Sequence, residues 1–487
     1  MDLVIAESEP NMINSLQFGL PESAAYITDR KQVHFPSVSG NIFSASNGNK
    51  YLKFVITGED NNYLDLSSVS LFFDLVNTDT DANKYLRPLG ESHAFFTRYR
   101  CNAAGQQIND IDNYNQVCEE FKSFKSEEVR NLDDIQEGCL TRYDSRINRL
   151  YAFNIESHDA EATTGGNNRG IVLPKLTRMN TTGIEQGKFV RMGHKPCCGF
   201  VQSGYYPPVR YCPLEFIFEI VSDPTEPVIE PATNGADQAT DDNNGKYFTE
   251  RNTTTSWSIQ NAILRCELIQ VDNTVNNNIV SHLLKGGRLR MVYPAYHSFS
   301  QTFSTGNTEI NMNIVKSSTR LSQMFFTFSN SNIDSDNTAG NYDKKKWNYF
   351  FHPMAVTIDN LEGVIDSNRQ ISAQIQIANK KFPEQEITSI AEFMYFLRRA
   401  VNVMSPYYDG FSIDIYRYAN DKFIGGINFD KQPDVNFTGS NTKMGSLITF
   451  KLKGANQNFA LGIERVFVTM VSEHVFELSE SASTVLD

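Results

Sequence analysis

Apolar and polar residues alternate with a period of two in many segments of this chain. In such a segment one face of a strand is apolar and the other is polar. The clearest cases are SVSLFFDLV (Val69, Leu71, Phe73, Leu75), PLEFIFEIV (Leu214, Phe216, Phe218, Ile220), ISAQIQIA (Ile371, Ala373, Ile375, Ile377), FSIDIY (Phe411, Ile413, Ile415) and SLITFKLK (Ile448, Phe450, Leu452). Turn residues separate these segments, and helical patterns are few. The pattern predicts an all-β protein built from antiparallel β-sandwiches.

Three segments instead repeat their apolar residues every three or four positions, which is the spacing of one helix face. After a strand that ends near Cys101 and a Gly-centred loop over 102–107, the first helix is expected from Asp110 to Phe124, with Asn109 or Asp110 as its cap. The second opens with a capping box of Ser389 and Glu392. The third is capped by Asp272 or Asn273 and stopped by Gly286. Their apolar faces are Ile111, Tyr114, Val117 or Cys118, Phe121 and Phe124; Ile390, Phe393, Met394 and Leu397; and Val275, Ile279 and Leu283.

The order of these patterns repeats once along the chain. An aromatic strand, a second strand, a helix and two long final strands occur in each half, without recognisable sequence identity. We therefore expect an N-terminal arm (1–40), a first sandwich (41–274), a helical connector (275–287) and a second sandwich (288–487). Three turn-rich segments are predicted to be long surface loops: 156–170, 223–256 and 330–346.

Charge and cysteine content narrow the classes of function. The net charge is −13 and no concentrated Lys/Arg segment occurs, which disfavours direct, sequence-specific binding of nucleic acid. The seven cysteines include no CxxC pair, which favours reduced thiols in a cytoplasmic or nuclear setting. The first residues become acidic within seven positions, unlike a signal peptide, and no apolar run approaches the ~20 residues of a membrane span.

Candidate chemistry is sparse. His194 with Cys197 and Cys198 is the best metal candidate, although adjacent cysteines rarely share one ion, and packing or buried thiols is the commoner explanation. Glu215 and Glu219 share one strand face as a glycosidase pair would, yet a solvent-facing acidic stripe is more common. The segment IDSDNTAG lacks the Gly and Glu of a calcium loop. We predict no catalytic, cofactor-binding or metal-binding residues.

The helical segment also carries a resemblance to a known family. FFTRYRCNAAGQQINDIDNYNQVCEEFKSF resembles a segment of the double jelly-roll major capsid proteins of Polinton-like viruses, virophages and Polintons. The matching residues are Arg98, Arg100, Gly105, Gln106, Ile108, Asp110, Ile111, Tyr114, Asn115, Val117 and Glu119. Asn109 stands where Glu is more usual, and Gln116 where Arg is. The segments 30–58, 63–77 and 423–454 are similar to other stretches of the same family, so the resemblance is spread over most of the chain.

This resemblance implies two consecutive jelly rolls with short helices in their connections. It implies a non-enzymatic virion protein that forms a pseudo-hexameric homotrimer, and trimers that tile an icosahedral shell around a DNA genome. The implied partners are neighbouring capsomers and penton and minor capsid or cement proteins, with an inner membrane left open. Assembly would take place in the host cytoplasm or nucleus, with the long loops as outward towers and the helix faces near intersubunit contacts. The alternative is a carbohydrate-active or carbohydrate-binding β-sandwich that uses Glu215, Glu219 or Glu267.

Overall fold

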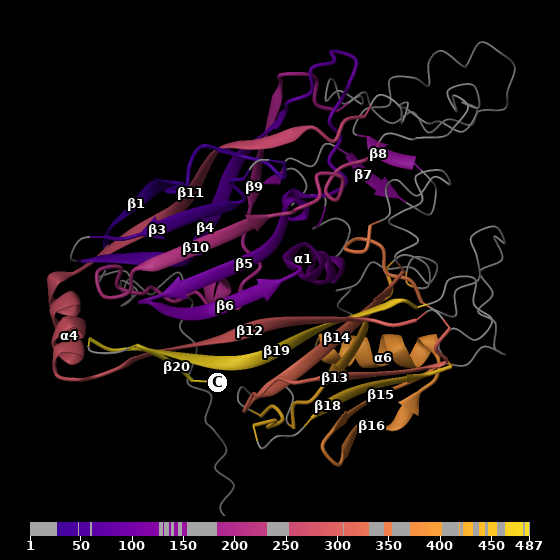
Figure 1. Ribbon diagram of the computed structural model, residues 1–487. Coiled ribbons are helices and arrows are strands. Elements are labelled where there is room, and N and C mark those ends of the chain that lie inside the picture. The colour runs from indigo at the N-terminus through magenta and orange to yellow at the C-terminus, as the bar shows by residue number, and fades with distance from the viewer. Residues whose placement is uncertain are drawn as a thin grey trace, which may run out of the picture.

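The protein consists of two β-sandwiches that lie side by side and are joined by one helix (Figure 1). The computed structural model describes residues 27–46, 48–58, 61–125, 130, 136–137, 141–144, 149–152, 183–230, 253–304, 306–330, 345–352, 371–401, 418, 422–431, 438–443, 447–454, 463–480 and 483–486. The predicted strand FSIDIY and most of the three predicted surface loops lie outside these residues.

The first sandwich pairs two sheets whose apolar faces meet. One sheet has the order β1-β11-β4-β9, with β2 also paired to β11, and the other has the order β3-β10-β5-β6. Their bounds are β1 (Ile27–Pro36), β2 (Ile42–Phe43), β3 (Tyr51–Ile56), β4 (Asn62–Asn77), β5 (Phe96–Ala103), β6 (Gln106–Asp112), β9 (Phe189–His194), β10 (Leu214–Ile220) and β11 (Trp257–Val271). A separate hairpin joins β7 (Thr141–Asp144) to β8 (Arg149–Ala152).

The second sandwich repeats this arrangement. Its sheets have the orders β12-β19-β14-β17, with β20 on β19, and β13-β18-β15-β16. Their bounds are β12 (Leu289–Thr302), β13 (Glu309–Ile314), β14 (Leu321–Ser329), β15 (Ser372–Ile377), β16 (Lys380–Ile387), β17 (Gly425–Asn428), β18 (Ile448–Lys453), β19 (Arg465–Leu478) and β20 (Thr484–Leu486). The strands pair antiparallel throughout both sandwiches.

The two strand orders match position by position. Strands β1, β3, β4, β5 and β6 correspond to β12 through β16, and β9, β10 and β11 correspond to β17, β18 and β19. Four strands in each of two facing sheets, connected in this way, form a jelly roll. The chain is therefore an all-β double jelly roll, and the repeat seen in the sequence pattern is confirmed at the level of topology.

Alternating apolar residues build the core as predicted. The inward residues of β10, which are Leu214, Phe216, Phe218 and Ile220, are all fully buried. Those of β4, β15 and β18 are buried in the same way. Aromatic contacts such as Phe73 with Phe96, whose ring centroids are 5.7 Å apart, join the two sheets of the first sandwich.

Helices occupy equivalent places in the two sandwiches. Helix α1 (Tyr114–Ser123) follows β6, and α6 (Ile390–Ala400) follows β16. The capping box of α6 is confirmed, because Ser389 and Glu392 each accept from the other's backbone N–H. The connector α4 (Asn273–Leu284) is capped by Asp272, whose side chain accepts from the N–H of Thr274 at 3.0 Å. The short elements are η3 (Ser92–Phe95) and α3 (Gly199–Gln202).

One predicted boundary was wrong. The first helix does not begin at Asp110, because residues 106–112 form β6 and pair with β5. Ala104 and Gly105 have φ values of 48° and 77°, the left-handed turn that closes a tight β-hairpin. Residues 27–36, which fall within the arm predicted over 1–40, form β1 and pair with β11. The division into domains stays a prediction.

Candidate functional site: the junction between the two sandwiches

Helix α1 lies between the two sandwiches rather than on the outside of the first (Figure 1). Its polar residues are buried as fully as its apolar ones. Gln116 Nε2 donates to Thr327 Oγ1 of β14 at 3.1 Å. The Glu120 carboxyl group meets the hydroxyls of Thr327 and of Thr469 in β19. The helix of the first sandwich is therefore hydrogen-bonded to the central strands of the second.

Aromatic residues of the first sandwich's helix region complete this contact. The Phe121 ring lies 4.7 Å from Tyr296 of β12, measured between centroids, and Phe124 lies 5.1 Å from Phe325 of β14. Phe121 and Phe124 belong to the apolar face predicted for the first helix. They pack on the second sandwich of the same chain. The equivalent stripe of α6, with Phe393 and Leu397, packs within its own sandwich.

The junction also contains a buried set of ion pairs. Arg130 lies 2.8 Å from both the Glu91 and the Glu119 carboxylate, measured from its Nε and Nη2 atoms. Lys122 pairs with Glu91 and with Glu137. Lys422, which precedes β17 in the second sandwich, pairs with Glu119. Three carboxylates therefore face three cations, and the His93 imidazole lies 3.2 Å from Glu119 in the same cluster.

The paired cations keep Glu91 and Glu119 charged despite burial. Desolvation alone would raise the pKa of Glu91, but Arg130 and Lys122 outweigh it and lower that pKa below its usual value. Burial would likewise raise the pKa of Glu119, but Arg130 and Lys422 hold that pKa well below its usual range. Glu120 has no such cation in contact, and desolvation raises its pKa to about 8 although both threonine hydroxyls act against this. Glu120 is thus protonated at neutral pH.

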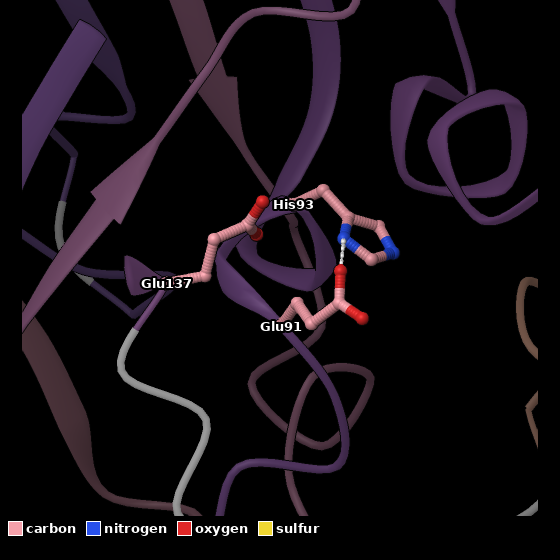
Figure 2. Close-up of side chains that lie close together, drawn as sticks. All are labelled: Glu91, His93 and Glu137. Atoms are coloured by element: carbon pink, nitrogen blue, oxygen red, sulfur yellow. Dashed lines mark ion pairs between the residues drawn. The ribbon is translucent and has the colours of Figure 1, made fainter. Parts of the chain in front are cut away.

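Glu91, His93 and Glu137 are close enough to hold a metal ion in principle (Figure 2). Figure 2 shows the Glu91 carboxylate directed at the imidazole of His93, at an N–O distance of 3.8 Å. The amino group of Lys122, however, contacts both carboxylates and so takes the position of a bound cation. We therefore interpret these residues as part of the ion-pair cluster.

His194, the histidine of the HKPCC segment, has both ring nitrogens engaged. Ser92 donates its hydroxyl hydrogen to Glu137 at 2.6 Å, so its oxygen accepts from His194 Nδ1 at 3.0 Å. His194 Nε2 then accepts from the Tyr114 hydroxyl at 2.8 Å, and that oxygen accepts from the Cys197 N–H at 2.7 Å. Burial holds the pKa of His194 well below its usual value, in accord with a neutral ring.

The HKPCC segment is therefore a packing element in this structure. Cys198 accepts a hydrogen bond from Asn109 Nδ2 at 3.5 Å, and Cys197 is held by Tyr114, so the candidate ligands do not converge on one point. Gly199 follows at the start of α3, where an added Cβ would lie 2.0 Å from the carbonyl oxygen of Pro294 in β12. The loop can approach the second sandwich this closely only because residue 199 has no side chain.

The candidate carboxylates of the glycosidase alternative are not brought together. Glu215 and Glu219 lie on β10, and Glu267 lies on β11 of the facing sheet. The neighbours of each along its strand are buried in the common core, so these carboxylates point out of opposite faces of the sandwich. Glu215 pairs with Lys53, and Glu267 with Arg30.

Sequence reasoning did not identify the charged residues of the junction. Glu91, Glu119, Lys122 and Lys422 carry no spacing that distinguishes them from surface charges. Their partners lie as far as 303 positions away along the chain, as with Lys422 and Glu119. Glu119 was among the residues that match the capsid-protein family, and this match was the one feature of the sequence that could have drawn attention to it.

Solved structures of other proteins share this architecture, although sequence comparisons find no match. No protein-family profile matches the sequence, and no curated protein matches it. Among solved structures, a chain of the Sputnik virophage matches with a TM-score of 0.57 and 11% identity, over 99% of this chain and 93% of that one. A chain of the PBCV-1 virus capsid matches with a TM-score of 0.55 and 10% identity, over 94% and 97%. The Faustovirus major capsid protein matches with a TM-score of 0.53 and 9% identity, over 96% and 93%. The chain thus shares, along almost its whole length, the double jelly-roll fold of these viral capsid chains.

Proposed function

We propose that this chain is a major capsid protein of the lineage that includes Polinton-like viruses, virophages and Polintons. The observation that carries the proposal is the presence of two jelly rolls of identical strand order, side by side in one chain. The chain shares this fold over 94% of its length with the PBCV-1 capsid chain and over 96% with the Faustovirus major capsid protein.

The geometry supports a trimer as the building unit. Three copies around a threefold axis place six similar sandwiches in a ring, so the ring has a nearly hexagonal outline and can meet six neighbours. Closed rotational symmetry of this kind repeats the same interface on every copy. Trimers of this shape can tile the faces of an icosahedral shell that encloses a DNA genome.

A rigid junction fits this role. A hexagonal outline is kept only if the two sandwiches of one chain hold a constant angle. The ion pair between Lys422 and Glu119 and the hydrogen bonds that join α1 with Thr327 and Thr469 link the two sandwiches. Buried pairs of this kind respond strongly to the loss of one partner and so favour one arrangement.

The proposal assigns no catalytic role to the chain. The buried carboxylates of the junction are paired with cations, and Glu215 and Glu267 are paired on opposite faces of one sandwich. No observation among the described residues favours the carbohydrate-active alternative.

The proposed partners are further copies of the chain, neighbouring capsomers, and penton and minor capsid or cement proteins. The proposed location is the virion, after assembly in the cytoplasm or nucleus of the host. A net charge of −13 agrees with a shell that does not bind the genome in a sequence-specific way. No helix among the described residues is long and apolar enough to cross a membrane.

Mass photometry of the purified full chain tests this proposal, followed by negative-stain imaging of the main peak. We expect particles of three times 55.1 kDa with a hexagonal outline. A chain that stays monomeric at every accessible concentration would contradict it. Hydrolysis of a glycan by that monomer, abolished in Glu219→Gln, would support the carbohydrate-active alternative instead.

A further inference from the structure

Helix α1 covers the outer face of one sheet of the second sandwich, β12-β19-β14-β17. Phe326 of β14 points into the core, because its ring centroid lies 4.8 Å from that of Phe450 in the facing sheet. Its neighbours Phe325 and Thr327 therefore point outward. These outward side chains meet the helix region, since Phe325 packs on Phe124 and the Thr327 hydroxyl bonds to α1. The helix that follows β6 of the first sandwich thus shields an outer sheet face of the second.

The first sandwich has the same outer face on its sheet β1-β11-β4-β9. Phe73 of β4 is fully buried in the core, so its neighbour Phe72 points outward. Phe72 pairs with Gly193 of the edge strand β9. Phe325 pairs in the same way with Gly426 of the edge strand β17, so the two phenylalanines occupy equivalent positions. Phe325 is buried, whereas Phe72 is partly exposed.

A second pair of equivalent positions shows the same contrast. Tyr296 of β12 and His34 of β1 each lie two residues along their strand from the row that contains the outward phenylalanine. Tyr296 packs on Phe121 and is 9% exposed. His34 is exposed. The positions that the helix region of the first sandwich shields on the second are therefore more open on the first.

Phe189 occupies the place at which the second sandwich forms its ion pair with α1. Phe189 lies four residues before Gly193, and Lys422 lies four residues before Gly426. Lys422 pairs with Glu119 of α1. Phe189 is instead 59% exposed at the start of β9. The first sandwich thus presents a large apolar side chain where the second presents a cation to its neighbouring helix.

Helix α6 is the counterpart of α1, and its outer face carries an exposed aromatic residue. The two helices align on their caps, Asn113 and Ser389, because each helix begins at the next residue. Glu119 of α1 and Tyr395 of α6 both lie six residues after the cap. Tyr395 is 48% exposed. Tyr395 and Phe189 therefore correspond to the two partners of the ion pair within the chain.

We propose that α6 of one copy packs on the outer face of the sheet β1-β11-β4-β9 of a second copy, with Tyr395 against Phe189. This contact repeats between chains the packing of α1 within the chain. Three such contacts alternate with three internal ones around the ring, which closes because every copy offers both halves of the interface. Two aromatic rings then supply by apolar contact what an ion pair supplies inside the chain. The inference rests on the proposed trimer and names the surface through which its copies bind.

Charge substitutions at the two positions test the contact. The assay is mass photometry of the full chain over a dilution series. Phe189→Lys and Tyr395→Glu should each raise the concentration at which half of the chains are in trimers by about tenfold or more. The double variant places a lysine opposite a glutamate, as in the pair of Lys422 with Glu119, and should recover most of the trimer. Val315→Lys is the control, because Val315 is 85% exposed after β13 of the other sheet, and it should assemble as wild type does.

The outcomes distinguish this inference from the proposed function. A wild-type chain that forms trimers, with both single variants forming them at the same concentrations, would overturn the inference and leave the capsid proposal standing. A wild-type chain that stays monomeric at every concentration would overturn both.

Photo-cross-linking gives a second measurement that does not depend on a destabilising variant. Benzoylphenylalanine in place of Tyr395 keeps an aromatic ring at this exposed position. Under ultraviolet light it should yield a product of twice 55.1 kDa, which mass spectrometry maps to β9 or β4 of the other copy. Cross-links that stay within one chain, or that join α6 to α6, would contradict the proposed contact.

Discussion

Glu120 makes the junction sensitive to alkaline pH. Its pKa is about 8 in the folded protein, against an ordinary 4.5. Between these values the folded chain holds a proton that the unfolded chain has released, so stability falls as pH rises. Each pH unit in this interval costs about 1.4 kcal/mol of unfolding free energy, which sums to about 5 kcal/mol from pH 4.5 to 8. Below pH 4.5 the carboxyl is protonated in both states, so its full stabilisation is present. Above pH 8 it is ionised in both states, so the loss of stability no longer grows.

Glu120→Gln isolates this effect, because an amide cannot ionise. Thr327 already accepts from Gln116, so it donates to the side chain of residue 120, and the amide oxygen can still accept there. In wild type the Thr469 hydroxyl donates to the Glu120 carboxyl, and in the variant the amide NH₂ can instead donate to the Thr469 oxygen. Titrations of all other groups cancel in the comparison with wild type. We therefore expect the variant to gain about 4 kcal/mol relative to wild type between pH 5 and pH 8.

Urea unfolding at pH 5, 6, 7 and 8, followed by the fluorescence of the buried Trp257 and Trp347, measures this difference. Glu386→Gln is the matched control. Its carboxylate is on the surface and has a pKa lowered by hydrogen bonds from Lys453 and Ser372, so it is ionised in both states across this range. The difference in unfolding free energy between Glu386→Gln and wild type should therefore not change with pH. A difference for Glu120→Gln that varies by less than about 1 kcal/mol over the same range would refute the reasoning.

Three further substitutions probe the fold. Lys122→Met leaves two buried carboxylates without their shared cation and should lower the unfolding free energy in urea by about 3–5 kcal/mol. Lys31→Met, which removes one partner of an exposed ion pair, should leave the unfolding free energy unchanged. Equal effects of the two substitutions would contradict the role of burial. Gly199→Ala places a methyl group against the β12 backbone and should lower the stability measured by thermal unfolding by about 1–3 kcal/mol. The added methyl group of Gly306→Ala points into open space, so this control should be tolerated. A Gly199→Ala variant as stable as wild type would show that the junction can relax. Ser389→Ala removes the cap of α6 and should cost about 1 kcal/mol by the same assay, and no loss would mean that packing alone holds this helix.

The sequence alone determined strands such as β10 and β18 and their inner faces. A strand alternates sides at every residue, so Phe216 and Phe450 had to face the same way as their second neighbours, and both are fully buried. The caps at Asp272 and Ser389 were also predictable, because a cap involves only the first turn of its own helix. Repetition of these local patterns in one order was enough to predict two sandwiches.

Other features depend on contacts between distant segments. Residues 110–112 fit a helix face as well as a strand, and the hairpin closed by Ala104 and Gly105 decided for the strand by pairing it with β5. The placement of β1 was likewise decided by β11, more than 200 residues later.

The junction is the clearest case. Glu119, Glu120 and Lys122 lie on a short amphipathic helix, where charged residues are usually solvated. Burial of a charge is tolerated only when partners replace its water, and here Lys422 lies 303 positions from Glu119. No local pattern records such a partner. Only the packing of one sandwich against the other turns these side chains from surface charges into the contact that holds the chain together.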